Sequence, residues 1–186
     1  MSRGHGAGAR RPAERGLLEA VAAELRPRGY RAYVDPDGSD YFDLAVLRGE
    51  EVGLVEGKVG RPSEVLGQAL RRRPWADWVA VVVPSEVTAR RLIARTTRQR
   101  ARAVGVWSAG GPRAVELRPA APFPSDPGAD PFRATRGLLR NHLLALETGE
   151  IPPTVRWSVV LAAVGRASAG RGFGEWRLDE LPTGQR

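Results

Sequence analysis

Six consecutive apolar residues, Trp78 to Val83, stand near the middle of this 186-residue chain. A strand with one face in water alternates polar and apolar residues, so an unbroken apolar run predicts a strand buried on both faces. Other elements must then cover both faces of its sheet. The run is far shorter than the roughly 20 apolar residues that cross a bilayer. We therefore expect an α/β protein with no membrane-spanning helix and no membrane partner.

The pattern on either side of this run predicts the order αβββαβαβ. Apolar residues recur at helical spacing from Pro12 to Leu25, and Ser85 is placed to cap a later helix. Turn residues separate the early strands, as in Asp35-Pro36-Asp37-Gly38. The fold class is α/β (α+β), a mixed sheet flanked by helices. The expected strands are 30–34, 41–47, 52–59, 78–83 and 105–108, and the expected helices are 12–25, 63–73 and 85–103.

Composition divides the chain into four segments. Residues 1–12 form a flexible basic tail without the apolar stretch of a secretory signal. Residues 13–108 form the core, and residues 109–130, with five of the fifteen prolines, form a linker or a loop around the core. Residues 131–186 form a small C-terminal helical extension, either a helical subdomain or a degenerate winged helix. Its expected elements are helices at 131–148 and 154–167 and a strand at 172–178.

The residue types that are missing exclude several kinds of chemistry. There is no cysteine, so disulfides, thiolate metal sites and a cysteine nucleophile are excluded. The two histidines, His5 and His142, leave no histidine-rich zinc site and no obvious Ser-His-Asp triad. We expect a cytoplasmic protein whose chemistry uses carboxylates, a lysine and a metal bound through oxygen.

The positive charge is concentrated in one part of the chain. The formal net charge is +8, and residues 61–118 hold 12 basic and 4 acidic side chains, whereas the flanking segments are nearly neutral. Such a basic patch attracts polyanions, above all nucleic acid, because its side chains neutralise the phosphates of the nucleic-acid backbone. The alternative is a solvated helix face with no partner. The predicted phosphate-contacting residues are Arg71, Arg72, Arg73 and the helical stripe Arg91, Arg95, Arg98 and Arg102.

Lysine is almost absent from the chain. Of 29 basic side chains, 28 are arginine and one is Lys58. Arginine cannot lose its proton and presents a planar fork, whereas lysine is a compact ammonium. A single lysine among so many arginines indicates a position where only the ammonium serves.

The predicted hairpin brings three charged side chains together. A turn near Gly49-Glu50 places Asp43 opposite Glu56 or Gly57, and alternation puts Glu56 and Lys58 on one face. Two carboxylates in an apolar sheet are costly unless they are compensated. A Mg²⁺ ion would compensate their negative charge, lower the pKa of a bound water and neutralise charge on a substrate phosphate. Lys58 would then position the attacking water or stabilise the charged transition state. The alternative is a buried salt bridge in a sheet without activity.

These residues resemble the PD-(D/E)XK nuclease superfamily. Asp43 followed by Glu56-Gly57-Lys58, between an N-terminal helix and a helix with a buried strand, has the order of that motif, although Phe42 replaces the usual proline. The resemblance implies a restriction-endonuclease-like αβββαβ core. It also implies that Asp43 and Glu56 are catalytic metal ligands and that Lys58 is catalytic.

Two narrower resemblances add residues to the site. Glu14-Arg15-Gly16-Leu17-Leu18, followed by Gly29-Tyr30, is similar to the first helix of archaeal Holliday-junction resolvases, which implies that Glu14 is an outer metal ligand. Residues 16–148 resemble an uncharacterised bacterial family assigned to the PD-(D/E)XK phosphodiesterases. That likeness implies a catalytic role for Gln68 and a side chain that points back toward the site. The alternative is that Gln68 is an ordinary exposed glutamine of the helix.

The sequence therefore predicts a phosphodiesterase, a nuclease that hydrolyses DNA with Mg²⁺ or, as a substitute, Mn²⁺. One alternative is a non-catalytic nucleic-acid-binding module on a nuclease fold. A second is a protein-interaction domain whose C-terminal helices carry the function. Whether the chain forms a homodimer, and whether it cuts internally or from ends, stays open.

Overall fold

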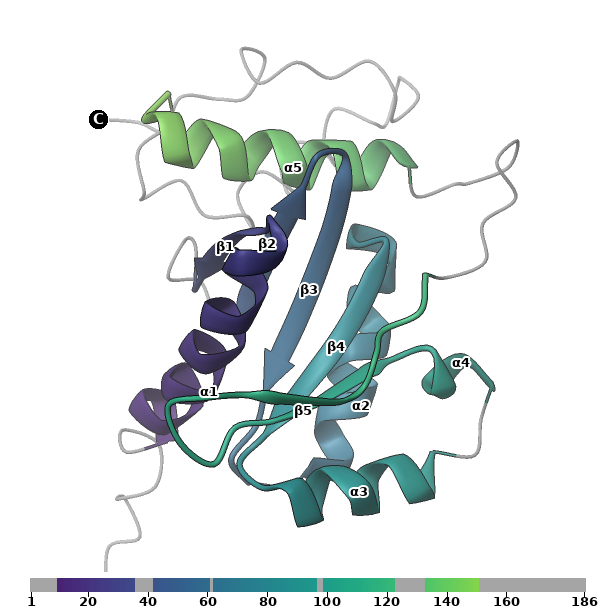
Figure 1. The fold of residues 1–186 in the computed structure, drawn as a ribbon. Coiled ribbons are helices and arrows are strands. Elements are labelled where there is room, and N and C mark those ends of the chain that lie inside the picture. Colours follow the sequence, from purple (N-terminus) through teal and green to yellow (C-terminus); the bar gives the residue numbers. More distant parts are fainter. Residues whose placement is uncertain (1–9, 36–41, 61, 97–98, 123–132, 151–186) are drawn as a thin grey trace, which may run out of the picture.

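The protein is a six-stranded mixed sheet flanked by helices (Figure 1). The computed structural model describes residues 10–35, 42–60, 62–96, 99–122 and 133–150. The strands lie in their sequence order, and only β4 pairs in parallel with both of its neighbours. The strands are β1 (Arg31–Val34), β2 (Leu44–Arg48), β3 (Glu51–Gly57), β4 (Trp78–Val83), β5 (Gly105–Ser108) and β6 (Val115–Arg118).

The sequence pattern anticipates the order of most elements. The central strand β4 occupies the predicted run and is buried at every position. Ser85 caps the next helix, because its Oγ accepts a hydrogen bond from the Thr88 N–H at 3.2 Å. The helices are α1 (Arg10–Leu25), α2 (Pro62–Arg72), α3 (Glu86–Arg95), α4 (Gln99–Arg102) and α5 (Arg133–Thr148), with 3₁₀ turns η1 (Arg26–Arg28) and η2 (Arg73–Trp75).

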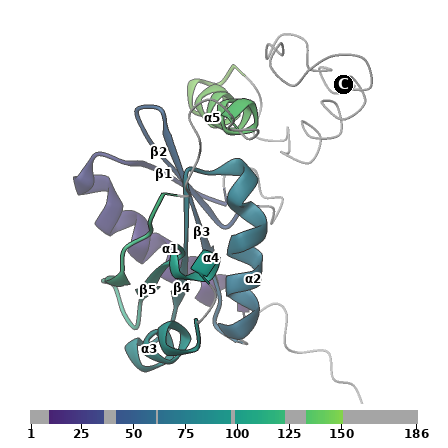
Figure 2. The ribbon, with the colours of Figure 1, turned by 90° about the vertical axis from the view of Figure 1, so that its right-hand side faces the viewer.

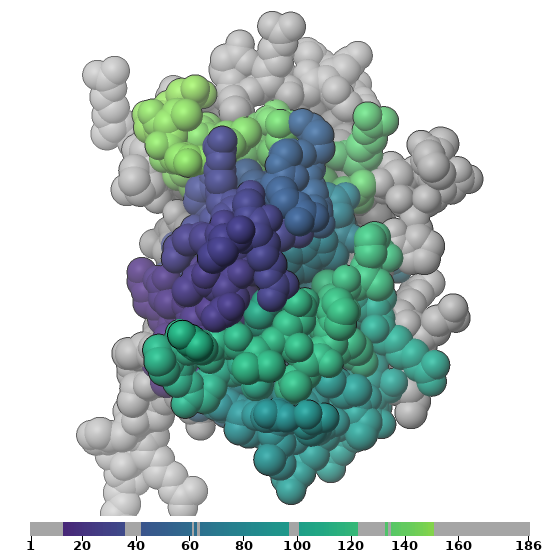
Figure 3. Space-filling view, in the orientation of Figure 1, coloured from purple at the N-terminus to yellow at the C-terminus, as the bar shows by residue number. Residues whose placement is uncertain are grey.

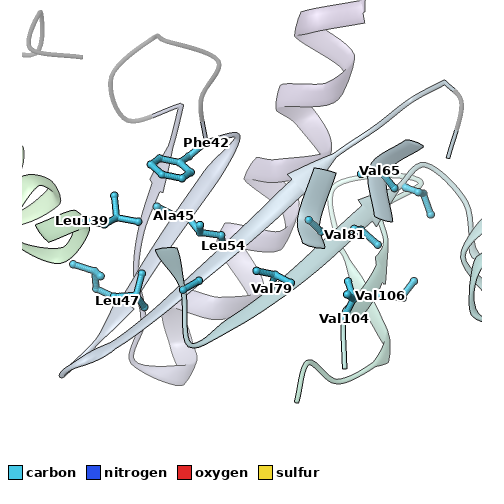
Figure 4. Close-up of a cluster of buried hydrophobic side chains, with 14 of the residues drawn as sticks. Phe42, Ala45, Leu47, Leu54, Val65, Val79, Val81, Val104, Val106 and Leu139 are labelled. Atoms are coloured by element: carbon cyan, nitrogen blue, oxygen red, sulfur yellow. The ribbon is translucent and has the colours of Figure 1, made fainter. Parts of the chain in front are cut away.

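Helices cover both faces of the sheet, so two hydrophobic clusters form. α1 packs on one face and α2 on the other, as the edge-on view of the sheet shows (Figure 2). On β3, Leu54 faces the α2 cluster and the next residue, Val55, faces the α1 cluster. The cluster on the α2 side also takes side chains from α3 and α5, Leu139 among them (Figure 4).

Three predictions about the second half of the chain are wrong. The helix expected over 85–103 is two helices, because α3 ends at Arg95 and α4 begins at Gln99. The segment 109–130 is more than a linker, since β6 within it pairs with β5. The start of the extension 131–186 is part of the core, because Leu139 and Leu143 of α5 are fully buried against the sheet.

Other predictions lie outside the described residues, namely the elements expected at 154–167 and 172–178. The N-terminal helix begins at Arg10, within the segment expected to be a tail. In the space-filling view α1, in purple, and the green segment that holds β5 and β6 cover adjacent parts of one face (Figure 3). Within the described ranges, no helix is long and apolar enough to cross a bilayer.

Candidate active site

The register of the β2–β3 hairpin places two carboxylates side by side. Leu44 of β2 pairs with Val55 of β3, so the preceding residue, Asp43, lies next to Glu56. Asp43 Oδ2 accepts a hydrogen bond of 2.8 Å from the Gly57 N–H. The sequence prediction that Asp43 lies opposite Glu56 or Gly57 is therefore confirmed.

Glu56 is buried and bound by an arginine of the next helix. Its side chain is on the strand face covered by α2, and the residue is 3% exposed. Glu56 Oε1 accepts a hydrogen bond of 2.8 Å from Arg72 Nε, and the Arg72 guanidinium lies over the ring of Phe42, 5.6 Å from its centroid. The ion pair compensates much of the cost of burying this carboxylate.

Lys58 lies just beyond the end of β3, on the side of α1. Its Nζ is 3.7 Å from Glu14 Oε1, which also accepts a hydrogen bond of 3.3 Å from the Val59 N–H. The Lys58 N–H donates to the carbonyl oxygen of Val82, so its backbone continues the parallel pairing. Lys58 pairs with a residue of α1 and Glu56 with a residue of α2, so the two side chains, which were expected to share a face, have their partners on opposite sides of the sheet.

The pKa of Asp43 reflects the burial of its carboxyl and the charges around it. The pKa of the Asp43 carboxyl is raised from 3.8 to about 7, chiefly by burial and then by the charges of Glu56 and, to a smaller extent, Glu14. The hydrogen bond from the Gly57 N–H and the charge of Arg72 oppose this rise in pKa. The charges of Glu56, Glu14 and Arg72 therefore all act on the Asp43 carboxyl.

The same residues can be tested for fit to a divalent cation. Asp43 and Glu56 supply the oxygen ligands that Mg²⁺ prefers, and a cation beside them would relieve the repulsion that raises the Asp43 pKa. Across the described ranges, no three His, Asp or Glu side chains gather closely enough to hold a metal. The residues fit a magnesium site with two carboxylates, completed by water and substrate oxygens, and do not fit an all-protein cage.

The other predicted residues of α2 and of the following turn η2 have different surroundings. Gln68 is half-buried, and its side chain makes no hydrogen bond to any residue in the described part of the chain. Arg71 is exposed, as a phosphate contact requires, and Arg73 is half-buried. The side chain of Arg72 is 19% exposed and binds Glu56, so it does not belong to the exposed phosphate-contacting surface predicted for it.

The predicted arginine stripe is not continuous. Arg91 and Arg95 are exposed on α3, and Arg102 is exposed on α4, but the helix break between α3 and α4 separates them. Arg98 lies outside the described residues. Of the predicted stripe, Arg91 and Arg95 form a pair one helical turn apart.

Sequence reasoning missed the part that Arg72 takes in the site. The available signal was its spacing, because residues four apart on a helix share a face. Gln68 was expected to point toward the carboxylates, and Arg72 follows it by four residues. That spacing could have placed Arg72 over β3 rather than in the solvent.

Comparison with known proteins gives little beyond this geometry. No family model and no curated protein matches the chain. A solved structure of a protein of unknown function from Silicibacter pomeroyi is similar over 81% of this chain and 98% of that one, with 19% sequence identity and a TM-score of 0.46. A similarity this distant carries no argument about activity, so function has to be argued from the side chains at the site.

Proposed function

We propose that this protein is a cytoplasmic, Mg²⁺-dependent phosphodiesterase that hydrolyses the backbone of DNA. The observation that carries the proposal is the pairing of Asp43 with Glu56 at the end of β3, where Lys58 follows directly and pairs with Glu14. Carboxylates beside an ammonium are the groups that phosphodiester hydrolysis needs, and the charge excess of the segment 61–118 suits a polyanionic substrate. The resemblance to the PD-(D/E)XK motif rests on the same three residues.

The residues of the site have separate roles in this proposal. Asp43 and Glu56 would hold the cation, and Glu14 would contact its water shell. A bound Mg²⁺ supplies a water of lowered pKa and neutralises charge on the phosphate. Lys58 donates hydrogen bonds to a phosphate oxygen, where negative charge grows in the transition state. Glu14 positions Lys58, since its carboxylate lies within ion-pair distance of Nζ.

Cleavage of supercoiled plasmid DNA tests this proposal. The wild-type protein should nick the plasmid with Mg²⁺ or Mn²⁺ and should not do so with EDTA. Lys58→Ala and Lys58→Arg should both lose nicking, because the argument requires an ammonium and not merely a positive charge. Arg26→Ala, which removes one exposed charge elsewhere, is the matched control and should cut as the wild type does.

The two possible failures of the proposal have different meanings. Undiminished cutting by Lys58→Ala would overturn the mechanism and would point to a contaminating nuclease. No cutting by a folded wild-type protein that still shifts DNA in a gel would favour the second candidate function.

That second candidate is a nucleic-acid-binding module without catalysis. It is favoured by one observation, the pairing of Glu56 with Arg72 and of Glu14 with Lys58, which satisfies the charges of the site internally. A binding module predicts DNA binding that needs no metal, weakens steeply with salt and does not change in Glu56→Gln.

A further inference from the structure

A groove opens between α2 and α3, apart from the carboxylates. Its volume is about 390 Å³, within the range of about 300–1,000 Å³ that is usual for small-ligand sites. Apolar side chains form much of its lining, and polar groups of α3 border it. The lining residues are Pro62, Leu66, Thr88, Arg91, Leu92 and Arg95.

Two arginines make this groove cationic. Arg91 and Arg95 are one helical turn apart on α3, and both are exposed. Within the described part of the chain, neither forms an ion pair and no carboxylate lines the groove. Their neighbour Arg90 is different, because its guanidinium forms an ion pair with Glu86 of the same helix. The groove therefore offers two unneutralised guanidinium groups beside an apolar surface.

The groove lies at the same edge of the sheet as the candidate active site. α2 begins at Pro62, four residues after Lys58, and α3 begins directly after β4. Since β3 and β4 are parallel, their carboxyl ends share one edge, where the start of α2 and α3 also lie (Figure 1). Because Glu56 also lies on the face covered by α2, a strand bound at the carboxylates would have the groove on the same side of the sheet.

We propose that this groove is a subsite for one nucleotide of the nucleic-acid strand, next to the phosphate held at the candidate active site. Arg91 and Arg95 bind the backbone phosphate of that nucleotide through charge-assisted hydrogen bonds. The side chains of Leu66 and Leu92 contact its sugar and base. The inference rests on the proposed function for the identity of the strand, and it adds the position and the groups that bind it.

Charge and shape together select this occupant. An apolar peptide would leave the two guanidinium groups without partners, and an inorganic phosphate would leave the apolar wall uncovered. A nucleotide carries an anionic phosphate and a base whose flat face packs on apolar side chains, so it satisfies both parts of the groove. Such a contact holds the strand without reading its sequence.

Fluorescence anisotropy with a labelled single-stranded oligonucleotide tests the arginines. The measurement is made in EDTA, so that binding is read without cleavage. The double variant Arg91→Ala/Arg95→Ala should bind about tenfold or more weakly, and the slope of log K against log salt should fall by about 1.4, which is two single-strand contacts. The control Arg90→Ala/Arg113→Ala removes the same charge from exposed positions outside the groove and should change affinity and slope much less. Equal losses in the two double variants would overturn the subsite.

The apolar wall is tested by a second variant. Leu66→Asn should weaken binding of the normal oligonucleotide by about fivefold, a loss of about 1 kcal/mol. It should leave binding of an abasic oligonucleotide of the same length unchanged, because that strand has no base to contact Leu66. An equal loss of affinity for the two oligonucleotides would contradict the assignment. It would also be contradicted if inorganic phosphate, at the concentration of the oligonucleotide, displaced the labelled strand.

The fate of this subsite can be separated from that of the proposed function. If the oligonucleotide measurements in EDTA give the expected results but the wild-type protein never cleaves DNA with Mg²⁺, the subsite is supported and the hydrolytic function is refuted. If the protein cleaves and the Arg91/Arg95 variant binds like its control, the function stands and the subsite falls.

Discussion

Arg72 of α2 donates a hydrogen bond of 2.8 Å from its Nε to Oε1 of Glu56 on β3. The contact joins an arginine that the sequence assigns to a phosphate-binding surface with a carboxylate that it assigns to a metal. Both side chains are largely withdrawn from solvent, at 19% and 5% exposed. The pair therefore contributes to the stability of the domain as well as to the electrostatics of the site.

Breaking this pair should be costly. We expect Arg72→Ala to lower the free energy of unfolding by about 3 kcal/mol, because it leaves the buried Glu56 carboxylate without its partner. Urea denaturation measures the loss. Arg71→Ala, the exposed neighbour on the same helix, is the control and should change stability by less than about 0.5 kcal/mol. A loss in Arg72→Ala no larger than that of the control would show that the pair is not a stabilising contact.

The stability of the metal-free protein should depend on the protonation of Asp43. Its pKa is raised from 3.8 to about 7, so between these values the folded state holds a proton that the unfolded state has released. Unfolding then releases a proton, and the free energy of unfolding falls as pH rises, by at most about 1.4 kcal/mol per pH unit from this group. Denaturation in EDTA from pH 4 to pH 7 should show a steeper fall for the wild type than for Asp43→Asn. Parallel curves for the two proteins would contradict the raised pKa.

Gly53 should tolerate no side chain. It lies in β3 beside Trp78 of β4, and a Cβ on Gly53 would overlap the indole ring. Gly53→Ala should therefore destabilise the domain by about 1–3 kcal/mol, the usual cost of overpacking.

Gly67→Ala is the opposite case, because Gly67 is in α2 and has only Arg71 nearby, at 3.6 Å. It should stabilise the protein by about 0.5–1 kcal/mol. Thermal melts that rank the two variants the other way would contradict this packing.

Helix α5 should behave as part of the core. Leu143 is fully buried in the cluster with Leu54 and Val79, whereas Leu146 of the same helix is only partly buried. We expect Leu143→Ala to cost about 2–5 kcal/mol and Leu146→Ala clearly less. Both variants are compared by urea denaturation. If Leu143→Ala is harmless, α5 is an appendage that the sheet does not need.

For the same reason, removal of residues 131–186 does not isolate a dispensable extension. Such a deletion takes away Leu139 and Leu143 and exposes the sheet beneath them. Function lost in the deletion would therefore report on folding. A truncation after Glu150 keeps every core contact described for α5 and is the informative variant for the second alternative, a function carried by the C-terminal part.

The sequence alone determined the strand β4, the order of helices and strands through α3, and the neighbours Asp43 and Glu56. These features depend on local pattern: an unbroken apolar run, helical spacing, and a tight turn that sets the register of one hairpin. Residues close in the chain have few ways to meet, so their arrangement can be read before the fold is known.

Only the tertiary structure decided the partners of the charged side chains. Arg72 reaches Glu56 because α2 crosses back over β3, and Lys58 meets Glu14 because α1 covers the other side of the sheet. The pairing of β6 and the packing of α5 likewise join segments far apart in sequence. Such contacts depend on how layers pack and on which rotamer a long side chain adopts, and no local period encodes either.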